Sequence, residues 1–334
     1  MPLHLHLGQS DLARCRFAIS PLWETQEAVR TLKMPGRQGY HLPWLRRVRE
    51  AARGLDLAPL WLLMPTPGHT PDFLGPPPIG PAAPFEEEIA AVRASDPEAA
   101  RRDIALSLAC TPGAADSPAG RAMLAEPATA VRELADALER AWRVLVEPDW
   151  PRLRALLEAD VAHHSWRLAQ VGLDGLLKEL HPRIDWDPGT LTLSARASSH
   201  RRRLDGQGLV LLPSVFSWPD VVSGFEAPWQ PTVAYPARGI AGLWSAPAAS
   251  TPAALAGVLG RGRADVLHAL DAPTSTSALA HALGRAPSSV SAHLTALRAA
   301  GLLTARRYGH QVLYERTPLG SALLTGGQDS RLGA

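Results

Sequence analysis

Cysteine and long apolar runs are scarce in this chain, and each scarcity excludes a class of protein. Only Cys15 and Cys110 occur in 334 residues, which excludes a disulfide-stabilised scaffold and a Cys-x-x-Cys metal site. The most apolar runs are interrupted by proline and are much shorter than the ~20 residues that span a bilayer. The start, "MPLHLHLGQSDLARCRF", lacks a basic segment followed by an apolar one, so we expect no signal peptide. These absences predict a cytoplasmic protein without a membrane partner.

Motifs that mark common catalytic sites are also missing. The sequence has no glycine-rich nucleotide loop, no Walker lysine, no Gly-x-Ser-x-Gly and no His-Glu-x-x-His. His4 and His6 alternate along a predicted strand, but two ligands without a third indicate an exposed pair rather than a metal site. We therefore expect no enzyme activity, no metal and no cofactor.

Positive charge is placed unevenly along the chain. The formal net charge is only +2, and just two lysines occur, Lys33 and Lys178. Residues 261–320, however, contain seven arginines and three acidic residues, a local net charge of +4. A basic segment at one end of an otherwise nearly neutral chain is typical of a nucleic-acid-binding domain.

The first 250 residues predict a larger domain of mixed structure. Ser20 and Pro21 are suited to the start of a helix over residues 20–33. Residues 64–84 hold too many prolines for regular structure and predict a long, partly ordered loop. Helical periodicity follows up to about residue 172, with Trp166 expected to pack against the core. Residues 184–236 predict a small antiparallel sheet that begins with a hairpin at Pro188-Gly189, and the basic run 196–204 predicts a solvated loop.

Residues 274–317 carry the clearest pattern. Thr276 is suited to cap a first helix whose buried face is Leu279, Ala280 and Leu283. Gly284 follows where a tight turn between helices favours a residue without a Cβ. Pro287 then starts a second helix at a position where its missing N–H costs nothing. These signals predict a helix-turn-helix.

The second helix predicts one buried and one outward face. Val290, Leu294 and Leu297 recur at spacings of four and three, which makes them the buried stripe, with His293 as a packing residue on its border. The outward face is small, rich in hydroxyls and free of acidic residues, as a helix in a major groove requires. We predict that this helix contacts DNA through Ser288, Ser289, Ser291, Ala292, Thr295 and Arg298.

A basic hairpin is predicted after the second helix. Its strands are Leu302–Ala305 and Gln311–Arg316, with a turn through Tyr308 and Gly309. The residues at its tip are suited to contact the DNA backbone or the minor groove. These candidate DNA-contacting residues are Arg306, Arg307, Tyr308 and His310.

Together these pieces resemble the winged helix-turn-helix domain of ArsR-family bacterial transcriptional regulators. The matching pieces are "SALAHALG", "APSSVSAHLTALRAAGLL", "RRYGHQVLYERT" and "PLG", over roughly residues 260–325. More loosely, the front of the chain resembles the uncharacterised N-terminal region of some longer actinobacterial members, in "LKMPGRQGYHLPWL", "PSVFSWPDV" and "VAYPARG". The resemblance implies a homodimer formed through helices that flank the winged domain, here residues 251–270 and the C-terminal end.

Two departures from the family pattern carry consequences. Ala286 stands where the family often has a serine or threonine that caps the recognition helix. The helix before the first helix of the motif has no cysteine pair, and only His268 in it could bind a metal, so thiolate metal sensing is not expected.

The sequence as a whole predicts a mainly α, α+β protein with a C-terminal winged helix-turn-helix and a larger mixed N-terminal domain. The predicted domains are residues 1–250, of unassigned function, 251–325, which bind DNA, and a flexible tail 326–334. The predicted function is a sequence-specific transcriptional regulator, a dimeric repressor on an inverted-repeat operator of double-stranded DNA, with a small organic effector bound by the N-terminal domain. Two alternatives stay open: a ligand-sensing or protein-interaction module whose winged domain does not bind DNA, and an enzyme in the N-terminal region.

Overall fold

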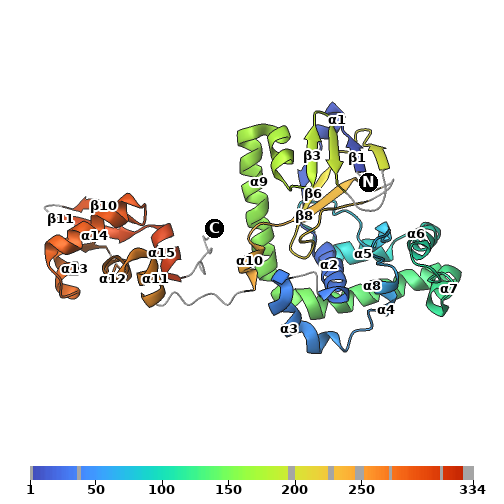
Figure 1. Cartoon of the computed structure of the whole chain (residues 1–334), viewed down its shortest axis with the longest axis horizontal. Coiled ribbons are helices and arrows are strands. Elements are labelled where there is room, and N and C mark those ends of the chain that lie inside the picture. Colours follow the sequence, from blue (N-terminus) through green and yellow to red (C-terminus); the bar gives the residue numbers. More distant parts are fainter. Residues whose placement is uncertain are drawn as a thin grey trace. The chain divides into compact units, whose positions relative to one another are not determined.

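The protein divides into two compact units. The computed structural model describes residues 3–35, 39–194, 200–224, 229–244, 252–270, 273–308 and 311–325. The first unit is Met1–Trp244 and the second is Ser245–Ala334 (Figure 1). Each unit has its own hydrophobic core, and the chain has the predicted α+β fold with a helix-turn-helix at its C-terminal end. No helix among the described residues has the length and apolar character that crossing a membrane requires.

Helices make up most of the first unit. Trp44, Leu60, Leu134 and Leu138 are completely buried in their shared core. A π-helical segment, Trp142–Val146, directly continues α8. The helices are α1 (Gln9–Leu12), α2 (Pro21–Lys33), α3 (Leu42–Ala52), α4 (Ala58–Leu62), α5 (Phe85–Arg93), α6 (Pro97–Ala109), α7 (Pro118–Ala125), α8 (Pro127–Ala141), α9 (Trp150–Glu179) and α10 (Ile240–Leu243).

Helix α2 begins as predicted and is buried on nearly every side. The Ser20 hydroxyl accepts a hydrogen bond from the Trp23 backbone N–H at 2.9 Å, and Pro21 is the first helical residue. Glu24, Gln26 and Glu27 are buried together with the apolar residues of the helix. Buried polar side chains require hydrogen-bond partners, so we expect the polar residues of α2 to bond to neighbouring elements of this unit.

Helix α9 corrects the prediction for Trp166. Its buried positions in this part are Leu153, Leu157, Asp160 and His164, a stripe with helical spacing. Trp166 follows His164 by two residues, which turns it about 200° away from that stripe. The prediction that Trp166 packs was wrong, and its residue surface is 59% exposed.

The strands of the first unit form two mixed sheets, so the prediction of one small antiparallel sheet was wrong. One sheet has the order β3-β4-β1-β5, and the other has the order β2-β6-β8-β7. The predicted hairpin at Gly189 is present as β3 and β4. In the first sheet the strands are β3 (Ile184–Asp187), β4 (Thr190–Leu193), β1 (Leu3–His6) and β5 (His200–Arg203), and in the second they are β2 (Arg16–Phe17), β6 (Val210–Ser214), β8 (Thr232–Pro236) and β7 (Val222–Gly224).

Both sheets contain parallel pairs between segments that are distant in the sequence. Strand β1 is antiparallel to β4 but parallel to β5, and β6 is parallel to both β2 and β8. The basic run that predicted a loop therefore includes an edge strand, β5, while residues 195–199 lie outside the described residues. His4 and His6 are half-buried on β1, where a hydrogen bond of 3.1 Å joins each ring to a threonine hydroxyl of β4.

The second unit packs its helices and a three-stranded sheet around one small core. Leu267, Leu279, Val290, Leu294 and Leu297 are buried in it. The sheet has the order β10-β11-β9, with every pair antiparallel. The elements are α11 (Pro252–Leu259), α12 (Arg261–His268), β9 (Thr274–Ser275), α13 (Thr276–Ala282), α14 (Pro287–Ala299), β10 (Leu303–Tyr308), β11 (Gln311–Arg316) and α15 (Pro318–Thr325).

Helix α15 packs closely against the end of the helix-turn-helix. The Thr317 backbone N–H donates to the Leu302 carbonyl at 3.0 Å. A Cβ at Gly320 would lie 2.2 Å from that carbonyl oxygen, so only glycine permits this approach. The "PLG" piece is thus the segment that docks α15 onto the winged domain.

Candidate nucleic-acid interface and an internal cavity

The turn between α13 and α14 has the predicted geometry. Leu279, Ala280, Val290, Leu294 and Leu297 are buried and hold the two helices together. Gly284 has a φ of +60°, the left-handed conformation that glycine adopts without strain.

The cap of α13 lies one residue before the predicted one. The Ser275 hydroxyl, not that of Thr276, accepts from the Ala278 N–H at 3.3 Å. Ser275 is still extended because β9 pairs with β11 there, and an N-cap residue needs extended backbone. The position of the cap is therefore decided by the sheet.

The outward face of α14 is exposed along its whole length. Its sequence, Pro287–Ala299, contains no acidic residue. The Thr295 hydroxyl donates to the Ser291 carbonyl at 2.9 Å, one turn earlier in the helix. The exposed candidate residues are Ser288, Ser289, Ser291, Ala292, Thr295 and Arg298.

Residues at the start of α14 and beside its buried stripe contact neighbouring elements. Ala286 provides no side-chain cap, because a methyl group cannot accept a hydrogen bond. His293 is half-buried, and its ring packs where a Cβ on Gly262 would lie 2.5 Å from Nε2. Arg285 donates to Asp265 at 2.6 Å, an ion pair that links the inter-helix turn to α12. His293 is therefore a packing residue, as expected, and Arg285 is engaged within the domain.

The hairpin β10–β11 is longer than predicted. Its first strand begins at Leu303 and continues through Tyr308, whose partner in register is Gln311. Arg306 and Arg307 are exposed on β10. Glu315 lies 3.6 Å from the Arg306 guanidinium across the pair of strands, which offsets part of its charge. His310 and the side chain of Tyr308 lie outside the described residues.

Comparison with known families agrees with this geometry. Residues 263–306 match a helix-turn-helix domain family. The C-terminal unit is a helix-turn-helix domain. Residues 82–241 match a family of unknown function, DUF5937, which covers most of the first unit from α5 to α10. No curated protein and no solved structure matches the chain.

The helix-turn-helix domain holds no cluster of metal ligands in its described part. His268 is exposed near the end of α12, and no group of three or more His, Cys, Asp or Glu residues converges among the described residues of the chain.

A partly open cavity of about 310 Å³ lies in the first unit, at the lower end of the range for ligand pockets. It opens beyond the carboxyl end of β6, the place where sheets with parallel strands commonly bind ligands. One wall is α2 and another is the proline-rich loop, which Gln26 holds by donating to the Leu74 carbonyl at 2.9 Å. The lining residues are Trp23, Gln26, Glu27, Arg30, Met34, Pro65–Asp72, Gly75, Phe216, Ser217, Pro219, Asp220 and Val222–Gly224.

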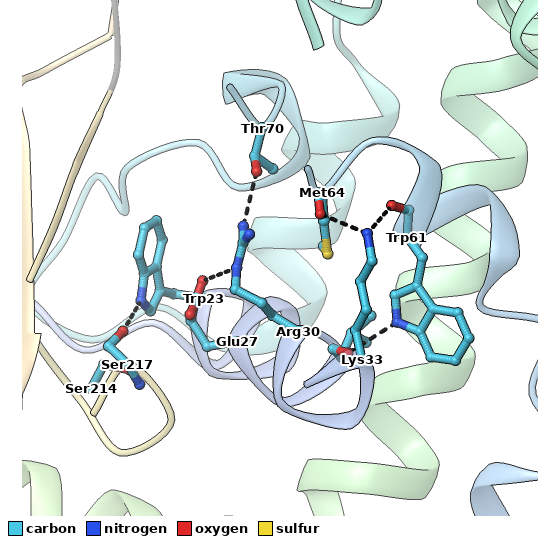
Figure 2. A network of polar contacts seen from close by, with 10 residues as sticks. Trp23, Glu27, Arg30, Lys33, Trp61, Met64, Thr70, Ser214 and Ser217 are labelled. Atoms are coloured by element: carbon cyan, nitrogen blue, oxygen red, sulfur yellow. Dashed lines mark hydrogen bonds and ion pairs between the residues drawn. The ribbon is translucent and has the colours of Figure 1, made fainter. Parts of the chain in front are cut away.

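Two basic residues of α2, Arg30 and Lys33, are engaged with the protein, as Figure 2 shows. Arg30 donates from Nε to Glu27 Oε1 at 3.2 Å and from a terminal nitrogen to the Thr70 hydroxyl at 2.9 Å. Lys33 donates to the carbonyls of Trp61 and Met64 at 2.7 and 2.9 Å. These bonds fix α2 to the proline-rich loop and leave little positive charge for a ligand.

Glu24 of α2 holds the wall of the cavity that is formed by the segment after β6. Its carboxyl group accepts hydrogen bonds from the backbone N–H groups of Val215 and Phe216 at 3.0 and 3.3 Å, just after β6 ends. Burial raises its pKa to about 8, and the hydrogen bonds from Ser214, Val215 and Phe216 oppose that shift. The segment that carries Phe216 and Ser217 is therefore positioned by a side chain of α2.

Sequence patterns did not reveal this cavity. Helix α2 is buried on nearly all sides, so its polar residues fall on no outward face that periodicity could identify. The available signal was the density of polar residues, "ETQE", in a helix otherwise rich in apolar residues. That signal indicates α2 as a site of buried polar residues, but it does not identify the other segments that line the cavity.

Proposed function

We propose that this protein is a sequence-specific, DNA-binding transcriptional regulator of the ArsR type. Helix α14 enters the major groove, where Ser288, Ser289, Ser291, Ala292, Thr295 and Arg298 face the bases and phosphates. Arg306 and Arg307 of the wing contact the backbone. The observation that carries the proposal is the outward face of α14, which is exposed, small and without any carboxylate.

The regulator acts as a homodimer. Helices α11 and α15, which flank the helix-turn-helix, expose aliphatic side chains: Val258 is 84% exposed and Leu319 is 56% exposed. Exposed aliphatic groups on both flanking helices support an interface between two copies. Two recognition helices of such a dimer reach successive major grooves about 34 Å apart, so the operator is an inverted repeat. In line with the family resemblance, bound dimer represses transcription.

The first unit senses a small organic effector in this proposal. The cavity beside α2 supports that role, because it combines an apolar wall with a few convergent polar groups. The proposal assigns no catalytic reaction to the chain and places the protein in the cytoplasm, where its DNA lies.

Selection of fragments from bacterial genomic DNA by the purified full chain tests the proposal. We expect a few fragments that share an inverted repeat to be enriched at two salt concentrations, with weaker retention at the higher one. The variant Ser291→Glu is the matched control and should enrich nothing above background. Equal retention of all fragments by both proteins at both salt concentrations would rule the proposal out.

A further inference from the structure

The cavity of the first unit carries an excess of negative charge. Its lining includes the acidic residues Glu27, Asp72 and Asp220 against the basic residues Arg30 and His69, and His69 pairs with Asp103 outside the lining. Arg30 is engaged by Glu27 and Thr70. Because Arg30 and His69 are both engaged with the protein, a ligand that enters this space meets acidic oxygens more readily than a basic group.

Glu27 is the buried carboxyl group of the set. It is only 5% exposed, and Oε1 accepts from Arg30 at 3.2 Å. Oε2 has no hydrogen bond or ion pair within the described residues and, unlike Glu88 Oε1, is not among their enclosed unpartnered oxygens, so it is accessible from the cavity that Glu27 lines. An accessible carboxylate oxygen in the lining of a cavity can accept a hydrogen bond from a ligand that enters it.

Asp220 lies near enough to Glu27 for the two groups to interact. The charge of Asp220 contributes to raising the pKa of Glu27, after the larger effect of burial and against the lowering effect of Arg30. Asp220 is itself partly exposed, and one of its oxygens pairs with Arg183. A cation between these carboxyl groups would relieve their mutual repulsion.

Apolar surfaces line the same space. Trp23, Phe216 and Met34 are among the lining residues. The Trp23 indole N–H donates to the Ser217 hydroxyl at 3.3 Å, which fixes the orientation of the ring (Figure 2). Aromatic faces favour both the apolar body and the charge of an organic cation.

We infer that this cavity binds a small organic cation, an ammonium group attached to an apolar or aromatic body, with Glu27 and Asp220 as the groups that recognise the charge. The inference names the chemical class of the effector and so rests on the sensing role proposed above. The ammonium group donates to Glu27 Oε2, and the apolar body lies against Trp23 and Phe216.

The test is a ligand-observed NMR titration of the full chain, without DNA, with three probes of similar shape: benzylammonium, benzyl alcohol and benzoate. We expect saturable binding of benzylammonium below about 10 mM, and binding of the alcohol and of benzoate at least about tenfold weaker. Benzoate that binds as tightly as benzylammonium would overturn the inference, and so would the absence of saturable benzylammonium binding in this range.

Two variants and one control test whether Glu27 and Asp220 recognise the charge of the ligand. Glu27→Gln and Asp220→Asn should each weaken benzylammonium by about five- to tenfold and leave benzyl alcohol unchanged. Glu50→Gln removes an exposed carboxylate on α3 and should change nothing. If Glu27→Gln fails to fold, the partly exposed Asp220 decides the outcome. Unchanged benzylammonium affinity in the folded variants contradicts the assignment.

DNA binding is measured separately in the same protein. If the protein binds its operator but none of the probe cations, the cation site is refuted and the proposed DNA-binding role stands. If the protein binds benzylammonium through Glu27 but selects no DNA, the cation site stands and the proposed regulatory function is refuted.

Discussion

Phe216 is a residue of the cavity lining, and its ring lies 6.0 Å from the ring of Trp244, the last residue of the first unit. Both rings belong to one aromatic cluster that also contains Trp44, 4.6 Å from Phe216. Trp244 is held further by the guanidinium of Arg47, 5.4 Å above its ring. Trp244, which directly precedes the second unit in the sequence, therefore packs against Phe216 of the proposed effector site.

Replacing Trp244 should destabilise the first unit. Its indole N–H donates to His41 Nδ1 at 3.0 Å, and within the described residues the buried His41 Nε2 already has no partner. Trp244→Phe keeps an aromatic ring but removes that donor, so we expect a loss of about 1–3 kcal/mol in the free energy of unfolding. Urea denaturation followed by tryptophan fluorescence measures this unit alone, because all ten tryptophans lie between residues 23 and 244. The exposed Trp166→Phe should lose less than about 0.5 kcal/mol, and an equal loss in both variants would contradict the role of the hydrogen bond.

A buried carboxyl group should make the first unit less stable in alkaline solution. Glu88 accepts hydrogen bonds from the Ser20 hydroxyl and the Leu22 N–H, and its other oxygen, Oε1, is buried without a partner in the described part of the chain. Burial raises its pKa from 4.5 to about 8. The folded state therefore holds a proton that the unfolded state has released, so stability falls as pH rises through this window and levels off above about 8.

The variant Glu88→Gln isolates that effect. Between pH 6 and pH 8 we expect the wild-type chain to lose about 2 kcal/mol more stability than the variant. Glu24, whose pKa is also raised to about 8, contributes equally to both proteins and cancels in the difference. Urea denaturation at pH 6, 7 and 8 gives the comparison, and parallel curves for the two proteins would show that Glu88 is ionised in the folded state.

The arginines of the wing should set part of the salt dependence of DNA binding. Arg306 and Arg307 are exposed on β10. The double change to alanine should weaken binding to operator and random DNA alike and reduce the slope of log K against log salt by about 2, because each lost phosphate contact removes about 0.9. Fluorescence anisotropy at several salt concentrations measures the slope. Arg101 and Arg102, exposed on α6, provide the matched double-alanine control, and an unaltered slope in the wing variant would refute the wing contact.

Charge on the outward face of α14 should be decisive for operator binding. Ser291 is exposed there, and Ser291→Glu would bring a carboxylate against the phosphates. We expect operator affinity to fall by about a hundredfold or more. Ser291→Gln adds similar bulk without the charge and should cost less than about tenfold. Circular dichroism should show the same helix content in both, and equal affinities of the two variants would place the DNA elsewhere.

The proposed dimer depends on aliphatic contacts of the flanking helices. Val258→Asp or Leu319→Asp should convert the chain from dimer to monomer in sedimentation velocity, because an unpaired carboxylate would be buried in the interface. Operator affinity should fall with it, since one recognition helix then binds alone. Leu106→Asp changes a similarly exposed leucine on α6 and should leave the mass unchanged. A dimer that persists in both flanking-helix variants would locate the interface in the first unit.

The helix-turn-helix could be predicted from the sequence because its signals are local. The spacing of Val290, Leu294 and Leu297 determines which side of α14 is buried, and Gly284 marks the turn within ten residues of that stripe. Even here the cap fell on Ser275 rather than Thr276, because strand pairing with β11 decides where the chain stops being extended.

Only the tertiary structure decided the arrangement of the first unit. A period of two predicts a strand at Leu3–His6 but cannot name β4 and β5, nearly two hundred residues later, as its partners. The same holds for the cavity, where Glu27 of α2 meets Asp220 from beyond β6. Periodicity records which side of one element is buried, whereas the meeting of two distant carboxyl groups depends on long-range packing that no local pattern contains.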